Sequence, residues 1–324
     1  MVRFKKAVVD ADQLCYSVGF AAADDPISHA LYSVKKQLEK IQKQCGAETI
    51  ELYVKGEGNF REEIAITHGY KAHRAATPKP PHYAGIMDYL VNKHKAIKCD
   101  GMEADDRVSI ELYKDYIAAG GDRDKATLVL SSNDKDLNNT PGWHHNPRSG
   151  EIVWYSDLQS TRHFWYQMLT GDTADNIKGI PKLPWHLCKK YGVSTVGVGP
   201  TSAKKLMALT SSAEDAECFA YQLYLEWGNM EGYSEQLVKD YILENAQLLW
   251  MVRELDEAGN PVMFQINEEL YERAKEQVQY TTIPDEGGDS TGGDRDNPYR
   301  DNGWEAEYTD QPVDTLRITP NRSR

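Results

Sequence analysis

The stretch Ala126-Thr127-Leu128-Val129-Leu130-Ser131-Ser132 decides the fold, and it runs directly into Asn133-Asp134-Lys135-Asp136. Its apolar, β-branched residues are typical of a central strand in a parallel sheet, because such a strand is covered on both faces. In open α/β sheets, ligands bind outside the carboxyl ends of the strands. We therefore expect Asp134 and Asp136, which follow the end of this strand, to belong to a functional site.

A second strand of the same kind lies near the N-terminus. Ala7-Val8-Val9 is apolar and ends in Asp10-Ala11-Asp12. Asp10 is a second candidate for a site at the carboxyl edge of the sheet, and the alternative is that Asp10 or Asp12 caps the following helix. Apolar residues then recur at helical spacing from Ile27 to Cys45, and a further strand is expected at 49–54. This alternation predicts a doubly wound, mostly parallel α/β sheet.

Three carboxylates are crowded into Gly101-Met102-Glu103-Ala104-Asp105-Asp106. The residues after them have helical periodicity, so the acids would occupy the first turn of a helix, where its dipole favours negative charge. Such decoration of a helix start is the simpler interpretation. However, three like charges this close repel one another, and a bound divalent cation would relieve that repulsion. The recurrence of acids after two strands favours the metal site.

Composition indicates a globular protein without a membrane span. The chain has 324 residues, of which 40% are hydrophobic, and no apolar run approaches the roughly 18 residues that a span needs. The N-terminus does not resemble a secretion signal. The five cysteines are scattered and form no C-x-x-C pair, so we expect reduced thiols and a cytoplasmic protein, in the host cell if the chain is viral. The pair His144-His145 is expected on a surface loop.

The net charge of −13 at first argues against a nucleic-acid partner. The distribution of charge weakens this argument, because much of the excess of acids over basic residues lies in residues 281–324 and in the expected metal site. Basic residues cluster at 71–79, 93–98, 178–190 and 204–205. In Tyr70-Lys71-Ala72-His73-Arg74, cations alternate with aromatic rings, as on surfaces that track a nucleic-acid strand.

Two further motifs follow. The first is Gly171-Asp172-Thr173-Ala174-Asp175-Asn176, which adds two acids. The second, Gly197-Val198-Gly199 followed by a helix with Lys204 and Lys205, offers backbone N–H groups and charge to a phosphate. It is not a Walker A loop, because Ala203 precedes the lysines. A hairpin between two helices that holds the DNA backbone fits it best.

The motifs taken together, in their order along the chain, resemble the bacteriophage 5′→3′ exonucleases and flap endonucleases, which are related to the 5′-nuclease domain of bacterial DNA polymerase I. The resemblance covers residues 5–255 and implies a PIN-like α/β fold. It rests on Val9-Asp10, Tyr70-Lys71 with Arg74, Glu103-Ala104-Asp105-Asp106, Asp134-Lys135-Asp136, Gly171-Asp172 with Asp175-Asn176, and Gly197-Val198-Gly199 with Lys204.

The resemblance implies a role for each matching residue. Two Mg²⁺ ions, replaceable by Mn²⁺, would be held by two groups of acids: Asp10, Glu103, Asp105 and Asp106, and Asp134, Asp136, Asp172 and Asp175. Catalytic roles fall to Tyr70, Lys71 and Arg74, in a helical gateway for the 5′ strand at 57–97. Gly197, Gly199, Lys204 and Lys205 would bind duplex DNA in a helix-hairpin-helix, with K⁺ as a further cation.

The resulting expectation for domains is an α/β nuclease domain at 1–160, a helix-hairpin-helix region at 161–255, a C-terminal segment at 256–280 and a disordered acidic tail at 281–324. Expected substrates are double-stranded DNA with 5′ ends or flaps and RNA/DNA hybrids, with replication proteins as further partners, in phage DNA replication or host DNA breakdown.

Two features depart from the family pattern. No Asp follows the second strand, where Glu57 is the nearest acid, and residues 182–196 are an added segment. The first departure leaves open a DNA-binding scaffold with an impaired site. A PIN-type ribonuclease is the other alternative, although the glycine turn argues against it.

Overall fold

The sheet is an open α/β sheet in which five adjacent strands, from the β3 edge inward, are parallel. In the computed structural model, which describes residues 3–72, 78–193, 197–278 and 315–316, the strand order is β3-β2-β1-β4-β5-β6-β9. The strands from β3 to β5 are parallel, and β6 and β9 run antiparallel to their neighbours. This order confirms the predicted fold class. The strands are β1 (Phe4–Asp10), β2 (Ala47–Lys55), β3 (Ile97–Cys99), β4 (Leu128–Ser131), β5 (Gly142–His145), β6 (Ile152–Tyr155) and β9 (Thr315–Leu316).

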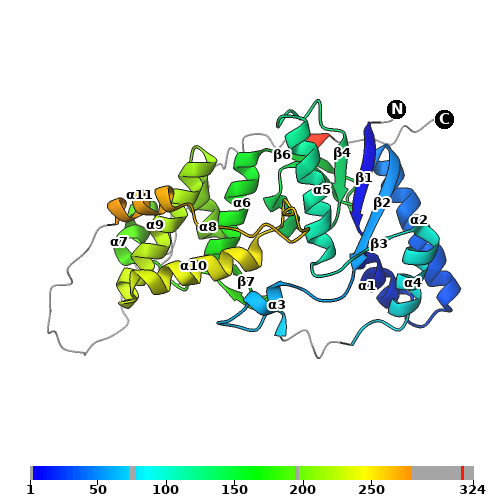
Figure 1. Ribbon diagram of the computed structural model, residues 1–324, viewed down its shortest axis with the longest axis horizontal. Helices are drawn as coiled ribbons and strands as arrows, with labels where there is room; N and C mark the ends of the chain where they lie inside the picture. Colours follow the sequence, from blue (N-terminus) through cyan, green and yellow to red (C-terminus); the bar gives the residue numbers. More distant parts are fainter. Residues whose placement is uncertain (1–2, 73–77, 194–196, 279–314, 317–324) are drawn as a thin grey trace, which may run out of the picture.

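Helices cover both faces of this sheet (Figure 1). Helices α1 (Asp12–Ala21), α2 (Ile27–Cys45) and α4 (Tyr83–His94) pack on one face, and α5 (Ala104–Ala118) packs on the other. Successive residues of β1 point to opposite faces of the sheet: Val9 packs in the core under α1, α2 and α4, and Val8 packs in the core under α5. Both are buried, which explains why β1 is apolar at successive positions rather than at every other one.

The longest helix of the first layer shows how the sequence specifies the elements. The apolar residues Val34, Leu38 and Ile41 of α2 recur at helical spacing and are all buried against the sheet. The helix ends at Gly46, whose φ of 61° is in the left-handed region that glycine adopts without steric cost.

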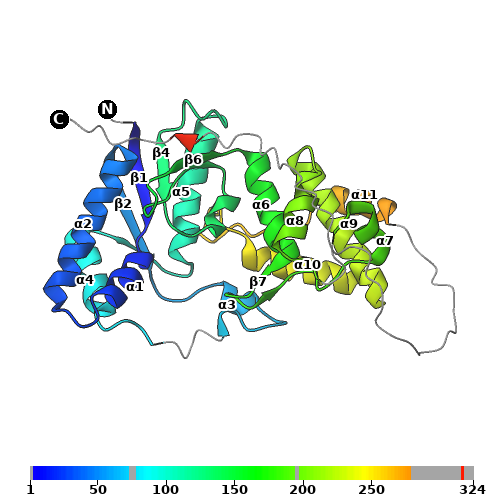
Figure 2. The ribbon, with the colours of Figure 1, turned by 180° about the vertical axis from the view of Figure 1, so that it is seen from behind.

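A second group of helices lies beside the sheet, around its own core (Figure 2). Trp165, Tyr221 and Tyr224 are fully buried there, so this part has a substantial apolar interior. A short hairpin, β7 (Gly171–Asp172) with β8 (Ile177–Lys178), follows the first of these helices. The helices are α6 (Asp157–Thr170), α7 (Trp185–Tyr191), α8 (Pro200–Ala208), α9 (Ala213–Glu231), α10 (Glu235–Leu249) and α11 (Glu268–Gln277).

Two expectations differ from the structure. His144 and His145 lie in β5 rather than on a surface loop, and both are buried, because their strand adds to the sheet beside β4. Within the expected tail, Thr315–Leu316 pair with β6, while the remainder of 281–324 lies outside the described residues. The five cysteines are free and buried, as expected of reduced thiols. Across the described ranges, no helix is long and apolar enough to span a membrane.

Candidate active site

Asp10 lies at the carboxyl end of β1 and is 8% exposed. Its Oδ2 accepts a hydrogen bond from Nε2 of Gln13 at 3.0 Å, and its Oδ1 accepts one from the backbone N–H of Asp12 at 3.2 Å. Burial raises the pKa of Asp10 to about 7, and the charges of Asp12 and Asp134 add to this shift. Asp10 therefore both supports the start of α1 and holds a carboxylate close to that of Asp134.

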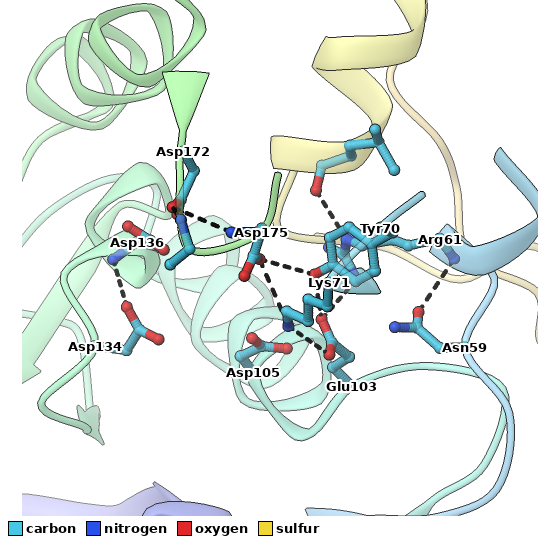
Figure 3. Close-up of polar contacts among 12 residues, drawn as sticks. Asn59, Arg61, Tyr70, Lys71, Glu103, Asp105, Asp134, Asp136, Asp172 and Asp175 are labelled. Carbon is cyan, nitrogen blue, oxygen red and sulfur yellow. Dashed lines mark hydrogen bonds and ion pairs between the residues drawn. The ribbon is translucent and has the colours of Figure 1, made fainter. Parts of the chain in front are cut away.

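Five of the eight predicted metal ligands line one polar cavity of about 360 Å³. They come from three separate parts of the chain: the first turn of α5, the loop after β4, and the β7–β8 hairpin (Figure 3). These residues are Asp105, Asp134, Asp136, Asp172 and Asp175. Asp10 lines a neighbouring cavity instead, and Glu103 joins the group through contacts with the gateway segment, residues 57–97.

Tyr70 and Lys71 of the gateway segment connect Glu103 to Asp175 across this cavity. The Nζ of Lys71 lies 2.7 Å from Oε1 of Glu103 and 3.5 Å from Oδ2 of Asp175. The hydroxyl of Tyr70 donates to Glu103 at 2.8 Å and lies 3.0 Å from Oδ2 of Asp175. The backbone N–H of Lys71 also donates to the carbonyl of Asp175 at 3.1 Å. An ammonium group thus occupies a position between carboxylates of α5 and of the hairpin.

The ionisation of these groups reflects that arrangement. Burial alone would lower the pKa of Lys71, but Glu103 and Asp175 outweigh it and the pKa is raised. Burial would raise the pKa of Glu103, but Lys71 and Arg61 lower it, so Glu103 stays ionised. For Asp105 the balance is reversed: burial and the charges of Glu103 and Asp106 outweigh Arg61 and Lys71, and its pKa is raised well above the ordinary value.

Asp136 has a raised pKa on the other side of the cavity, where the charge of Lys135 offsets only part of the shift. Burial, Asp134 and Asp172 together raise its pKa to about 7. The Nε2 of Gln167 donates to Oδ1 of Asp136 at 2.8 Å, and Gln167 is 5% exposed. No sequence motif points to Gln167, because a glutamine on the buried face of α6 does not differ in pattern from a structural residue. Its position next to Asp136 makes it a positioning residue for that carboxylate.

Asp106 differs from the other predicted ligands, because its carboxylate is paired with the guanidinium of Arg61. It is fully buried and forms two hydrogen bonds with the guanidinium of Arg61, at 2.5 and 2.7 Å. It also accepts from the backbone N–H of Glu103, completing a capping box at the start of α5. The simpler interpretation of helix-start decoration therefore applies to Asp106, and we leave it out of the proposed ligand set.

Arg61 extends this contact to the helical part. Its Nε donates to the carbonyl of Leu248 at 2.9 Å, and its Nη2 donates to the carbonyl of Trp250 at 2.6 Å. The side chain is fully buried. Arg61 therefore joins the gateway segment, the first turn of α5 and the end of α10, a long-range role that no local pattern reveals.

The aspartates of the cavity supply the hard oxygen donors that Mg²⁺ and Mn²⁺ prefer. Among the described residues, no group of three or more Asp, Glu, His or Cys side chains is arranged closely enough to hold a metal ion. Burial and neighbouring carboxylates raise the pKa values of Asp10, Asp105 and Asp136, so these groups hold protons more readily than exposed aspartates do. The donor atoms are of the type that divalent cations prefer, and a bound cation would favour the ionised carboxylates.

The residues of the expected DNA-binding hairpin do not line the cavity. Glu57, the acid nearest to the position of the missing Asp, is exposed and does not line the cavity. Gly197 has a φ of 73°, and Gly199 forms the N-cap of α8, on which Lys204 and Lys205 are exposed. The expected hairpin between two helices would comprise α7, the residues up to Gly199 and α8, and residues 194–196 within it lie outside the described residues. Arg74 lies outside the described residues.

The fold and the cavity together define an α/β protein with a carboxylate-rich site at the carboxyl edge of its sheet. No family model and no curated protein matches the chain. Among solved structures, the chain is similar to the T5 D15 protein co-crystallised with metal ions, with 13% identity over 84% of this chain and 97% of that one, at a TM-score of 0.40.

Two further solved structures are similar. A pseudo-enzyme–product complex of the bacteriophage T5 D15 flap endonuclease with DNA and metal ions shares 14% identity over 75% of this chain and 98% of that one, at a TM-score of 0.41. The catalytic core of Rad2 in complex with DNA substrate shares 13% over 87% and 82%, at 0.41. At these values, the likeness assigns no activity to this chain.

Proposed function

We propose that the protein is a divalent-metal-dependent nuclease that hydrolyses DNA from 5′ ends or at 5′ flaps. The observation that carries the proposal is the cavity in which five aspartates from three parts of the chain face Tyr70 and Lys71. Asp10, Glu103 and Asp105 would hold one Mg²⁺, and Asp134, Asp136, Asp172 and Asp175 the other. Bound Mg²⁺ would stabilise the charge that develops on the attacking and leaving oxygens of a phosphodiester.

Lys71 would supply the positive charge that the chain itself contributes. Its ammonium group now contacts Glu103 and lies within 3.5 Å of Asp175. Cations held by those carboxylates would weaken their attraction for Lys71, and its ammonium group would then be available to the scissile phosphate. Tyr70, which bridges the same two acids, orients them. Arg74 would bind the incoming 5′ strand.

The turn before α8, Gly197 to Gly199, would bind duplex DNA. Gly197 adopts a positive φ before Gly199, the N-cap of α8, and the N–H groups in the first turn of that helix have no intrahelical acceptor. Lys204 and Lys205 lie on α8 and are exposed. The same proposal includes a K⁺ ion at this turn. It also includes RNA/DNA hybrids as substrates and replication proteins as partners.

The test is cleavage of end-labelled substrates with Mg²⁺: blunt duplex, nicked duplex, 5′ flap, RNA/DNA hybrid and single-stranded RNA. The proposal expects cleavage of DNA from the 5′ side, silenced by EDTA and by Asp172→Asn. Binding without cleavage of any substrate would identify an impaired scaffold, for which the missing acid after β2 is the motivation. Cleavage of RNA alone would identify a ribonuclease. Either result contradicts the proposal.

A further inference from the structure

Residues 176–213 contain no Asp or Glu, although these acids make up 50 of the 324 residues of the chain. The same stretch is rich in lysine, so it is a basic segment within a protein of net charge −13. Such segregation favours a polyanionic ligand, since the rest of the surface would repel one. The lysines are Lys178, Lys182, Lys189, Lys190, Lys204 and Lys205, and all are exposed.

Helix α7, within the segment added relative to the family pattern, carries an exposed indole among these lysines. Trp185 is 67% exposed, whereas Trp143, Trp154, Trp165 and Trp227 are buried and Trp250 is half-buried. The Nζ of Lys189 lies 5.2 Å from the centre of the Trp185 ring. Large aromatic side chains normally contribute to the core, so an indole left at the surface beside cations is suited to binding a ligand.

The helix is firmly held, so this surface is preformed. Leu187 and Cys188 are buried in the core of the helical part. The end of α7 contacts α8, because Nζ of Lys205 donates to the carbonyl of Gly192 at 3.0 Å. The C-terminal end of α7 is therefore adjacent to α8, to whose lysines we assign duplex binding.

We propose that α7 is a second nucleic-acid contact, at which Trp185 stacks on an unpaired base and Lys189 and Lys190 bind the flanking phosphates. This inference rests on the proposed function in that its ligand is DNA. A paired base has both faces covered by its neighbours, so an indole on the surface finds a stacking partner where bases are unpaired. The ligand is therefore a single strand that continues from the duplex.

The position of α7 separates this contact from the chemistry. It lies in the part of the helical group that is farthest from the sheet (Figures 1 and 2), whereas the carboxylate cavity lies where the two parts meet. Trp185 would thus meet nucleotides away from the scissile bond. It should increase affinity for tailed DNA without affecting the rate of the chemical step.

The test measures binding of the full chain to labelled DNA by fluorescence anisotropy in EDTA. Three probes share one duplex sequence: blunt, 5′-tailed and 3′-tailed. Trp185→Ala should weaken binding of a tailed probe by about tenfold or more and leave the blunt duplex nearly unchanged, while Trp185→Phe keeps most of the affinity. Replacing both Lys189 and Lys190 with Gln should reduce the steepness of log K against log salt for the tailed probes by about one or more.

The matched control is Tyr32→Ala on α2. Tyr32 is 62% exposed and also has a lysine ammonium over its ring, Lys36 at 5.6 Å, but it lies on the sheet part of the molecule. The Tyr32→Ala variant should bind all three probes with the affinity of the unmodified protein. Tryptophan fluorescence should be quenched by tailed DNA and lose most of that quenching in Trp185→Phe.

Equal affinity of Trp185→Ala and the unmodified protein for both tailed probes would overturn the inference, as would an equal loss for blunt and tailed probes, which would indicate a duplex contact. A cleavage assay with Mg²⁺ on the same probes keeps the two proposals distinct. Failure of the unmodified protein to cleave would refute the proposed nuclease and leave the binding result intact.

Discussion

The Nζ of Lys71 lies 2.7 Å from Oε1 of Glu103, so the ammonium group of the gateway segment is inserted among the acids of the carboxylate cavity. The backbone of Lys71 has a φ of 51°, in the left-handed region, and is held there by its N–H bond to Asp175. Such a conformation is uncommon for a residue with a side chain. The lysine is therefore held close to the position where a substrate phosphate would meet the acids.

Replacing Lys71 with Met should lower the single-turnover rate of DNA cleavage at saturating DNA by on the order of a hundredfold, because a charge that stabilises the transition state acts on that step. The dissociation constant for DNA should change little. Lys98→Met, at an exposed lysine of β3, is the control and should cleave normally. An unchanged rate for Lys71→Met would show that the segment only guides the strand.

Breaking the Arg61–Asp106 pair should destabilise the fold rather than act on chemistry alone. Arg61→Met leaves a buried, unpaired carboxylate and should cost about 3 to 5 kcal/mol in the free energy of unfolding, measured in urea. Arg61→Met combined with Asp106→Leu should recover much of that loss. If Asp106→Asn instead left stability unchanged and weakened binding of divalent cations, Asp106 would be a ligand after all.

The raised pKa of Asp136 makes metal-free stability depend on pH in a defined direction. In the folded protein this pKa is about 7, against roughly 3.9 for an unfolded Asp. Between these values the folded state holds a proton that the unfolded state releases, so this term lowers stability as pH rises toward 7.

Asp136→Asn removes that term. In EDTA it should unfold at a higher temperature than the unmodified protein at pH 8, by the equivalent of about 1 kcal/mol or more, with a smaller difference at pH 5. Thermal unfolding followed by circular dichroism measures this. A difference of the same size at both pH values would mean that the effect of Asn is not electrostatic.

Removing Lys204 and Lys205 together should weaken binding of duplex DNA equally for all sequences. Each phosphate contact contributes a slope of about −0.9 in log K against log salt, so the double change to Gln should flatten the slope by roughly two. Affinity titrations at several salt concentrations measure it. Losses that differ between duplex sequences would indicate base recognition, contrary to the account.

Much of the site could be predicted because parallel strands bring their carboxyl ends to one edge. Asp10 ends β1 and Asp134 follows β4, which is the neighbour of β1 in the sheet, and the charge of Asp134 raises the pKa of Asp10. The pattern of apolar runs ending in acids therefore located both residues. Helical periodicity likewise placed Glu103 at the start of α5.

The contacts that could not be predicted all join distant parts of the chain. Helical spacing puts Asp106 near Glu103, but only the tertiary structure brings Arg61 to Asp106, 45 residues away in sequence. Gln167 contacts Asp136 because α6 packs beside the loop after β4. His144 and His145 are polar residues typical of loops, yet strand pairing buries them.

The claim that the carboxylate cavity holds divalent cations is tested most directly by Mn²⁺ binding, followed through the electron paramagnetic resonance signal of the free ion. About two ions should bind per chain, and at least one should be lost in Asp134→Asn and in Asp172→Asn, each with an unchanged circular dichroism spectrum. Asp88→Asn, at an exposed acid of α4, should bind Mn²⁺ like the unmodified protein. Undiminished Mn²⁺ binding in Asp134→Asn and Asp172→Asn, or none in the unmodified protein, would contradict the account.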